Sequence, residues 1–245
     1  VERSRGLGDV YKRQDVDPIT FNINPESIEK AITKKTKAIV PVHLFGQVAQ
    51  MEKIMQIAKK HGIFIIEDNA QALGANFTYS NGNKVKAGCI GDIGTTSFFP
   101  SKNLGCFGDG GAIFTNDDEL AHLIRGIANH GMYERYYHDV VGVNSRLDSI
   151  QAVVLDEKLK HLDLYNKRRR ESALKYSEYF ENNQKIITPI ILGDGDSHVF
   201  HQYTLKIIDS DRNALGAHLR KNNIPFGVYY PVPLHLQKAY QDKKY

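Results

Sequence analysis

The chain has 245 residues, 41% of them hydrophobic, and a formal net charge of +4 from 32 basic and 28 acidic side chains. It contains no apolar run of about 18 residues, which predicts a soluble globular protein with a sizeable core and no membrane span. The basic residues do not cluster as they do in nucleic-acid-binding proteins, and the densest cationic run, residues 166–171, is typical of a solvated helix face. Cys89 and Cys106 have no metal or redox spacing, which is typical of a cytoplasmic protein.

The first 14 residues differ in character from the rest of the chain. They contain no apolar segment of the kind found in secretory signals. Residues 4–14 resemble the translation of an adapter used to prepare sequencing libraries. We therefore expect residues 1–14 to be a sequencing artefact, the alternative being a genuine basic arm.

Strand and helix signals then alternate, which predicts an α/β domain with a mostly parallel sheet over residues 15–160. A helix is expected from Pro25, at the first helical position, to about residue 33. A buried strand is expected over residues 37–43, and a helix from Met51 should end at Gly62.

The next helix should follow Asn116, with Glu119 three residues later as in a capping box, and should run to Gly131. A helical pattern without glycine or proline then extends from Asp148 to about Phe180.

A smaller α+β domain is expected over residues 161–245, with its boundary near residue 160. Its predicted elements are strands near residues 185–192 and 198–208, a helix near 212–222 and a strand near 226–230. His198 and His201 would face opposite sides of a strand, so they do not suggest a metal pair, and no metal site is predicted.

Lys102 stands between a short apolar run and a glycine-rich turn. Residues 97–100, Ser-Phe-Phe-Pro, precede it and Leu104 follows. These neighbours predict a desolvated side chain, and burial favours the neutral amine over the ammonium ion. A neutral lysine amine condenses with carbonyl groups, so Lys102 is a candidate Schiff-base residue. The alternative is a surface lysine beside a turn.

Asp68 follows a second apolar run, residues 64–66, which predicts a strand buried on both faces of a parallel sheet. Ligands of open α/β sheets bind at the carboxyl ends of strands, and Asp68 is expected one residue beyond such an end, after Glu67. A carboxylate there can pair with the protonated ring nitrogen of pyridoxal phosphate. The alternative is that Asp68 caps the next helix.

Together these runs resemble the DegT-type (DegT/DnrJ/StrS) sugar aminotransferases, which use pyridoxal 5′-phosphate. The resemblance extends from Asp15 to about Tyr240 and includes two further runs, residues 142–155 and 227–240. It implies a fold-type I pyridoxal-phosphate enzyme, with a large domain built on a mostly parallel sheet and a smaller α+β carboxyl-terminal domain.

The resemblance also implies roles for single residues. Lys102 would bind the cofactor covalently and act as the catalytic acid and base, and Asp68 would pair with the ring nitrogen. Ala70 would lie against the ring, Gln71 would hydrogen-bond the phenolic oxygen, and Ser97 would bind the phosphate.

Three more residues are implied to act on the cofactor or the substrate. Asn144 would reach the cofactor phosphate of the neighbouring subunit, and Arg146 would be a substrate-side cation, so a homodimer with a shared active site is implied. Tyr230 lies in the segment that contacts the sugar nucleotide. Tyr229 replaces the histidine of the family pattern, a departure at this substrate contact.

The implied reaction transfers an amino group from glutamate to a nucleotide-linked keto-sugar for surface polysaccharide biosynthesis. The Lys102 run and residues 141–152 most resemble enzymes that aminate C3 of a UDP-linked 2-acetamido-3-keto-hexuronic acid, and Gln71 is also frequent among C3 enzymes. Two alternatives stay open: a C3 or C4 aminotransferase of dTDP- or GDP-linked deoxysugars, and a non-catalytic cofactor-binding regulatory protein.

Comparison with the family pattern predicts that this chain is an internal piece of a longer enzyme. The family has a segment before Asp15 that carries a phosphate-binding helix start and an aromatic residue stacked on the cofactor, and it continues past Tyr245. Both predicted domains would then be incomplete, and we expect the chain alone to be inactive.

Overall fold

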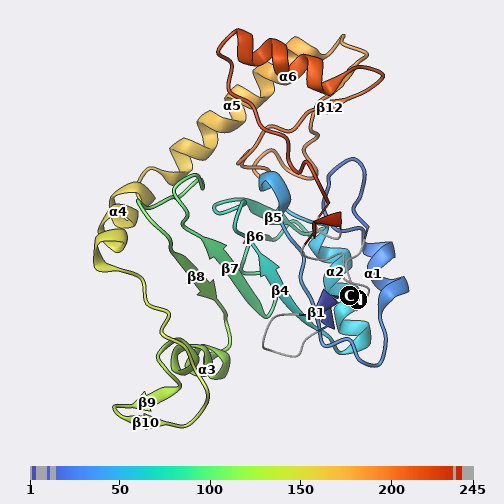
Figure 1. The fold of residues 1–245 in the computed structure, drawn as a ribbon. Helices are drawn as coiled ribbons and strands as arrows, with labels where there is room; N and C mark the ends of the chain where they lie inside the picture. Colours follow the sequence, from blue (N-terminus) through green and yellow to red (C-terminus); the bar gives the residue numbers. More distant parts are fainter. Residues whose placement is uncertain (1, 4–9, 12–14, 234–235, 239–245) are drawn as a thin grey trace.

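The computed structural model describes residues 2–3, 10–11, 15–233 and 236–238 (Figure 1). The helices are α1 (Pro25–Ala31), α2 (Met51–His61), α3 (Asp118–Ala128), α4 (Ser149–Leu159), α5 (Leu162–Phe180) and α6 (Arg212–Lys221), with a 3₁₀ turn at Leu44–Gly46. The strands are β1 (Glu2–Arg3), β2 (Val10–Tyr11), β3 (Ala38–Ile39), β4 (Phe64–Asp68), β5 (Asn76–Thr78), β6 (Lys84–Lys86), β7 (Ile93–Ser97), β8 (Gly111–Phe114), β9 (Met132–Glu134), β10 (Tyr137–His138), β11 (Ile186–Ile187) and β12 (Lys206–Ile207). Most of residues 1–14, over which an artefact is predicted, lie outside the described part, and the described residues do not test that prediction.

The central sheet has four strands in the order β3-β4-β7-β8. The first three are parallel and β8 is antiparallel to β7. The predicted α/β fold with a mainly parallel sheet is therefore confirmed. Because β3, β4 and β7 run the same way, the residues that follow them meet at one edge of the sheet.

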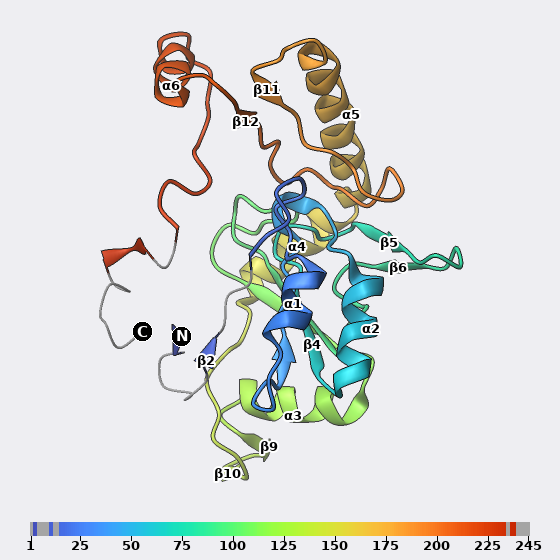
Figure 2. The ribbon, with the colours of Figure 1, turned by 90° about the vertical axis from the view of Figure 1, so that its right-hand side faces the viewer.

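The helices α1 and α2 cover one face of this sheet (Figure 2). Ile28 of α1, Ile54 of α2 and Ile65 of β4 are buried together in the core between them. The α2 helix ends as predicted at Gly62, whose φ of 63° is left-handed and whose N–H bonds to carbonyls of the last turn. Glycine adopts this conformation without a Cβ penalty.

The opposite face of the sheet carries exposed apolar side chains. Phe64 is 61% exposed, Ile113 52% and Val40 44%. They are exposed because α1 and α2 pack only against the face that holds Ile65. The prediction that residues 64–66 are buried on both faces is therefore wrong for the described chain, and so is the full strand over 37–43, of which only β3 forms.

The α3 helix begins one residue later than predicted. Its cap is Asp117, whose carboxylate accepts from the N–H groups of Glu119 and Leu120, and not Asn116. It ends at Ala128 and not at Gly131. The reason is that the Asn129 backbone leaves the helical conformation and pairs with Asn144 in an isolated bridge.

The predicted helix over residues 148–180 is two helices, α4 and α5, separated at Lys160 and His161. The break allows each helix to bury its own face, with Leu155 on α4 and Leu162 at the start of α5 in one cluster. In Figure 1, α5 leads away from the sheet toward β12 and α6.

The strands predicted in the last third of the chain are wrong in length or absent. Residues 185–192 and 198–208 form only β11 and β12, which pair over two residues each. Between β11 and β12 the chain runs beside the loop that precedes α2, where Leu192 N–H bonds to the Gln47 side chain and His198 forms a backbone bridge with Gln47. Residues 226–230 form no strand, since no described segment pairs with them.

The described chain shows no helix that is both long enough and apolar enough to cross a membrane. Nor do its described residues contain a group of three histidine, cysteine or acidic side chains that could hold a metal ion.

Candidate active site

Asp68 and Ser97 lie on the same face of the sheet, at the carboxyl ends of neighbouring parallel strands. Asp68 ends β4 and is in register with Thr95 of β7, two residues before Ser97. Side chains two apart in a strand share a face, so the carboxylate and the hydroxyl project to the same side. The Asp68 carboxylate accepts from Ala70 N–H at 3.0 Å, in a turn and not in a helix, so Asp68 is the last strand residue and not a helix cap.

Lys102 lies in the turn that joins β7 to β8, beyond the same edge of the sheet. Its backbone N–H bonds to Phe99 O at 2.9 Å. Lys102 is half-buried, so the predicted desolvation is only partial: its neighbours Phe99, Pro100 and Ser101 are exposed and leave part of Lys102 accessible. Among the described residues, neither Lys102 nor Asp68 has an oppositely charged partner within 4.0 Å.

The Lys102 loop is held from both sides. On one side, Gln151 of α4 accepts from the N–H groups of Phe107 and Gly108 at 2.9 and 3.0 Å, and Lys158 of α4 donates to Gly105 O. On the other, the amide of Asn103 is buried and bonded to α5. The glycine-rich segment is thus a fixed turn behind Lys102.

Gln71 and Ala70 follow Asp68 in the same turn, and both are half-buried. The Gln71 side-chain oxygen accepts from Phe45 N–H at 2.5 Å, which leaves the amide N–H groups as its donors. Phe45 has a φ of 59°, a left-handed conformation in which its N–H meets this oxygen. Gln71 can therefore donate to an oxygen near the Asp68 turn.

A fully buried carboxylate lies directly behind Asp68. Glu67 accepts from Gly88, Ile90 and Gly91 N–H groups at 2.8, 2.6 and 2.7 Å and lies 2.9 Å from His43 Nε2. His43 Nδ1 accepts from a backbone N–H, so Nε2 is the nitrogen that donates to Glu67. Burial alone would raise the pKa of Glu67, but the hydrogen bonds from His43 and the backbone hold it below its usual range.

Asn144 and Arg146 are not brought to this edge of the sheet. Asn144 pairs with Asn129, just after α3, and α3 follows β8 at the opposite end of the sheet from Lys102 (Figure 1). Both side chains are exposed, and Arg146 donates to Asn144 at 2.8 Å. Tyr230 is 62% exposed and contacts the Tyr229 ring edge-on.

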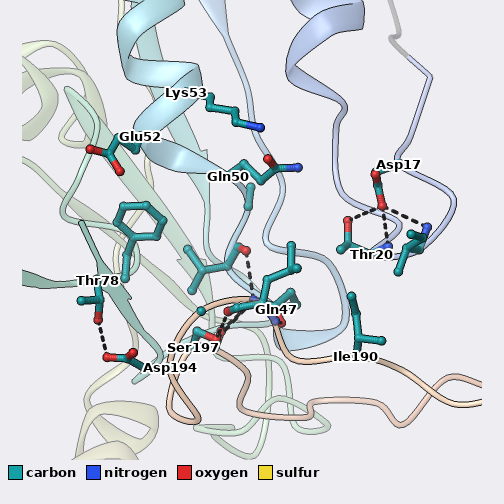
Figure 3. Close-up of a pocket in the computed structure, with 16 residues that line it drawn as sticks. Asp17, Thr20, Gln47, Gln50, Glu52, Lys53, Thr78, Ile190, Asp194 and Ser197 are labelled. Carbon is teal, nitrogen blue, oxygen red and sulfur yellow. Dashed lines mark hydrogen bonds between the residues drawn. The ribbon is translucent and has the colours of Figure 1, made fainter. Parts of the chain in front are cut away.

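A cavity of about 360 Å³ near the start of α2 contains none of the predicted site residues (Figure 3). Several of its polar groups bond to one another: Asp17 accepts from Thr20, and Thr78 donates to Asp194 at 2.8 Å. We therefore place the candidate site at the edge formed by Asp68, Ser97 and Lys102 and not in this cavity.

The residues at this edge fit pyridoxal phosphate. The carboxylate of Asp68 has no cationic partner among the described residues. It is therefore available to pair with a protonated ring nitrogen. Ser97 offers a hydroxyl whose oxygen accepts from Phe99 N–H and whose proton is available for an anion. Lys102 supplies the amine.

Comparisons with known proteins agree with this architecture. The profile of the DegT/DnrJ/EryC1/StrS aminotransferase family matches residues 7–245. The "pleiotropic regulatory protein" of Geobacillus stearothermophilus is 50% identical over 236 residues, 94% of this chain and 60% of the relative. A Pseudomonas aeruginosa UDP-2-acetamido-2-deoxy-3-oxo-D-glucuronate aminotransferase is 46% identical over 231 residues, 94% of this chain and 62% of the relative.

A solved structure has the same fold. The chain superposes on NtdA of Bacillus subtilis, crystallised with bound pyridoxamine phosphate cofactor, with a TM-score of 0.86 and 34% identity over 98% of this chain and 55% of that one. The architecture is that of the pyridoxal-phosphate-dependent aminotransferases. This chain belongs to the DegT/DnrJ/EryC1/StrS aminotransferase family, as its motifs predicted, and it spans about 60% of the length of the two curated relatives.

Sequence reasoning missed five residues that support the site: His43, Glu67, Asn103, Asn166 and His201. One signal was available. Asn166 stands four residues after Leu162 and seven before Ala173 on the buried stripe of α5, where a polar side chain needs a partner.

Proposed function

We propose that this chain is part of a pyridoxal-phosphate-dependent aminotransferase that moves an amino group from glutamate to a nucleotide-linked keto-sugar. The observation that carries the proposal is the placement of Asp68, Ser97 and Lys102 at one edge of the sheet, with no competing charge partner for Asp68 or Lys102 among the described residues. Membership of an aminotransferase family supports it.

Each residue has a defined task in this proposal. Bound pyridoxal phosphate supplies an electron sink for the carbon that loses its proton. Asp68 keeps a proton on the ring nitrogen, Ser97 holds the phosphate, Ala70 lies against the ring and Gln71 donates to the phenolic oxygen. Lys102 Nζ binds the cofactor and then moves a proton to and from the substrate carbon as general base and acid.

The proposed substrate is a UDP-linked 2-acetamido-3-keto-hexuronic acid, aminated at C3 for surface polysaccharide synthesis. The support is the 46% identity to an enzyme named for this type of substrate. A dTDP-linked sugar is the alternative, supported by 42% identity to a Streptomyces venezuelae dTDP-3-amino-3,4,6-trideoxy-alpha-D-glucose transaminase.

The active site is proposed to be shared between two subunits in a cytoplasmic homodimer. Asn144 and Arg146 are exposed and remote from Lys102 within one chain, which supports their action on a second copy. Tyr230 is proposed to contact the sugar nucleotide. Residues 15–160 would belong to the large domain and 161–245 to the small one, both continued in the full-length enzyme.

The test uses the full-length enzyme loaded with pyridoxal phosphate. Glutamate should bleach the absorbance of the lysine-bound cofactor, and the UDP-linked 3-keto sugar should restore it. Restoration by a dTDP-linked keto-sugar alone would reassign the substrate. Failure of glutamate and other amino donors to bleach the band would refute an aminotransferase.

A second function, a cofactor-binding regulatory protein without catalysis, is supported by the name of the Geobacillus stearothermophilus relative. Lys102 weighs against it, because a protein that only senses the cofactor does not need a residue that moves protons. Cofactor binding without bleaching by any donor would favour this function.

A further inference from the structure

The residue after Lys102 is tied to distant parts of the chain by buried amide groups. Asn103 Nδ2 donates to Asn166 Oδ1 of α5 at 2.7 Å and to Val199 O at 3.2 Å. Asn166 Nδ2 in turn donates to Leu73 O, in the turn after Asp68, at 3.1 Å. One hydrogen-bonded chain therefore connects the Lys102 loop, the Asp68 turn and the helix that leads out of the large sheet.

His201 completes this network. Its Nδ1 lies 3.3 Å from Asn103 Oδ1, and because an amide oxygen only accepts, Nδ1 must carry the proton. Burial, and then the charges of Lys102 and Arg169, lower the pKa of His201 to about 4. His201 is therefore a neutral hydrogen-bond donor at physiological pH, although it lies close enough to Lys102 to feel its charge.

The packing leaves this network little freedom. A Cβ on Gly74 would lie 2.6 Å from Asn166 Nδ2, and one on Gly46 would lie 2.9 Å from His201 N. Both glycines also have positive φ values, 88° and 105°, that disfavour other residues. The Asp68 turn and the segment before α2 thus approach Asn166 and His201 at backbone distance.

We propose that Asn103, Asn166 and His201 are positioning residues that fix the position of Lys102 relative to Asp68. In this network His201 acts as an uncharged hydrogen-bond donor. Lys102 is half-buried and has no carboxylate partner in the described chain, so its placement depends on the loop that the network fixes. The catalytic meaning of this placement rests on the proposed function, whereas the network itself does not.

A small displacement is enough to matter. Moving a reacting group by about 1 Å can cost a factor of about 100 in rate. A buried amide that loses one partner also leaves the other partner unsatisfied, so the network should fail as a unit.

The first test needs no cofactor and uses the full-length protein in its apo form. An NMR titration should find His201 neutral down to about pH 4, and Lys102→Met should raise its pKa because a neighbouring positive charge is removed. Lys53→Met, on exposed α2 surface, is the control and should leave the His201 titration unchanged. An ordinary His201 pKa near 6.5, or no response to Lys102→Met, would overturn the proposal.

The second test compares two substitutions of similar size in the full-length enzyme. His201→Gln keeps an uncharged donor and should retain kcat within about 3-fold, whereas His201→Leu should lower kcat about 10- to 100-fold with KM for glutamate nearly unchanged. Asn166→Leu should behave like His201→Leu, and Asn213→Leu on the surface of α6 should behave like wild type. If His201→Leu and His201→Gln have equal kcat, the proposal is wrong. If wild type itself shows no transamination, the proposed function fails, while the titration still decides whether the network exists.

Discussion

His43 Nε2 and Glu67 Oε2 lie 2.9 Å apart, both fully buried, on the side of β4 away from Asp68. The pair joins the carboxyl end of β3 to β4, where His43 N–H also bonds to Asp68 O at 3.0 Å. The buried pair of His43 and Glu67, on the opposite face of the sheet, thus fixes the backbone that carries Asp68.

Glu67→Gln is therefore expected to destabilise the fold. The substitution places an amide N–H group against buried donors, and breaking a buried pair in this way costs about 3–5 kcal/mol. Urea unfolding at pH 7 measures the loss. The control is Glu29→Gln, which removes a solvent-exposed ion pair with Lys60 and should leave the unfolding midpoint nearly unchanged. Equal effects of the two substitutions would show that the buried pair has no special role.

Stability should also fall in mild acid because of two buried histidines. Burial is the main cause that lowers the pKa of His198 to about 3 and of His201 to about 4. In the unfolded chain both titrate near 6.5, so the unfolded state binds more protons and stability is lost as pH falls from about 6.5 to 4. Unfolding midpoints measured across this range should fall less steeply for His201→Gln than for wild type. A parallel dependence in the two proteins would contradict this assignment.

Asp68→Asn should block catalysis in the full-length enzyme and leave the cofactor bound. An amide cannot hold a protonated ring nitrogen, so the half-reaction with glutamate should slow by about 100-fold or more, while the cofactor spectrum stays close to normal. Stopped-flow absorbance measures the half-reaction, with Asp139→Asn on an exposed loop as the control. A near-normal rate would mean that Asp68 only bonds to Ala70 N–H and orders the turn.

The chain of 245 residues alone is expected to be neither an active enzyme nor a stable dimer. It spans about 60% of the length of the curated relatives, and Phe64, Val40 and Ile113 are exposed on one face of its sheet. Exposed apolar surface of this kind promotes aggregation. Size-exclusion chromatography with cofactor absorbance tests this, and a soluble dimer that binds pyridoxal phosphate stoichiometrically would contradict it.

The sequence predicted the family, the parallel sheet and the ends of α2 because those features depend on local signals. Gly62 ends α2 in the left-handed conformation that its lack of a side chain favours. Lys102 and Asp68 became candidates because each follows a short apolar run, and Ser97 because its position matches the family pattern. The prediction that β4 is buried on both faces was wrong, because the burial of a strand face depends on which other segments pack against it.

The network around Lys102 was missed for a similar reason. His201 stands 35 positions after Asn166 and 98 positions after Asn103 in the sequence. Only the fold brings the three side chains together. The pairing of β11 with β12, and the cluster that Leu155 and Leu162 form with Leu104 and Cys106 at the break between α4 and α5, also depend on contacts between distant segments. Periodicity within one segment carries no information on such contacts.

The site of cofactor attachment in the full-length enzyme can be measured directly. The protein is loaded with pyridoxal phosphate, reduced with borohydride and digested, and the labelled peptide is identified by mass spectrometry. We predict a single label on Lys102, lost in Lys102→Ala together with all transamination, while cofactor binding is partly kept. Lys53→Ala should keep both label and activity. Label on another lysine, or substantial turnover by Lys102→Ala, would show that Lys102 is not the residue that binds the cofactor and moves the proton.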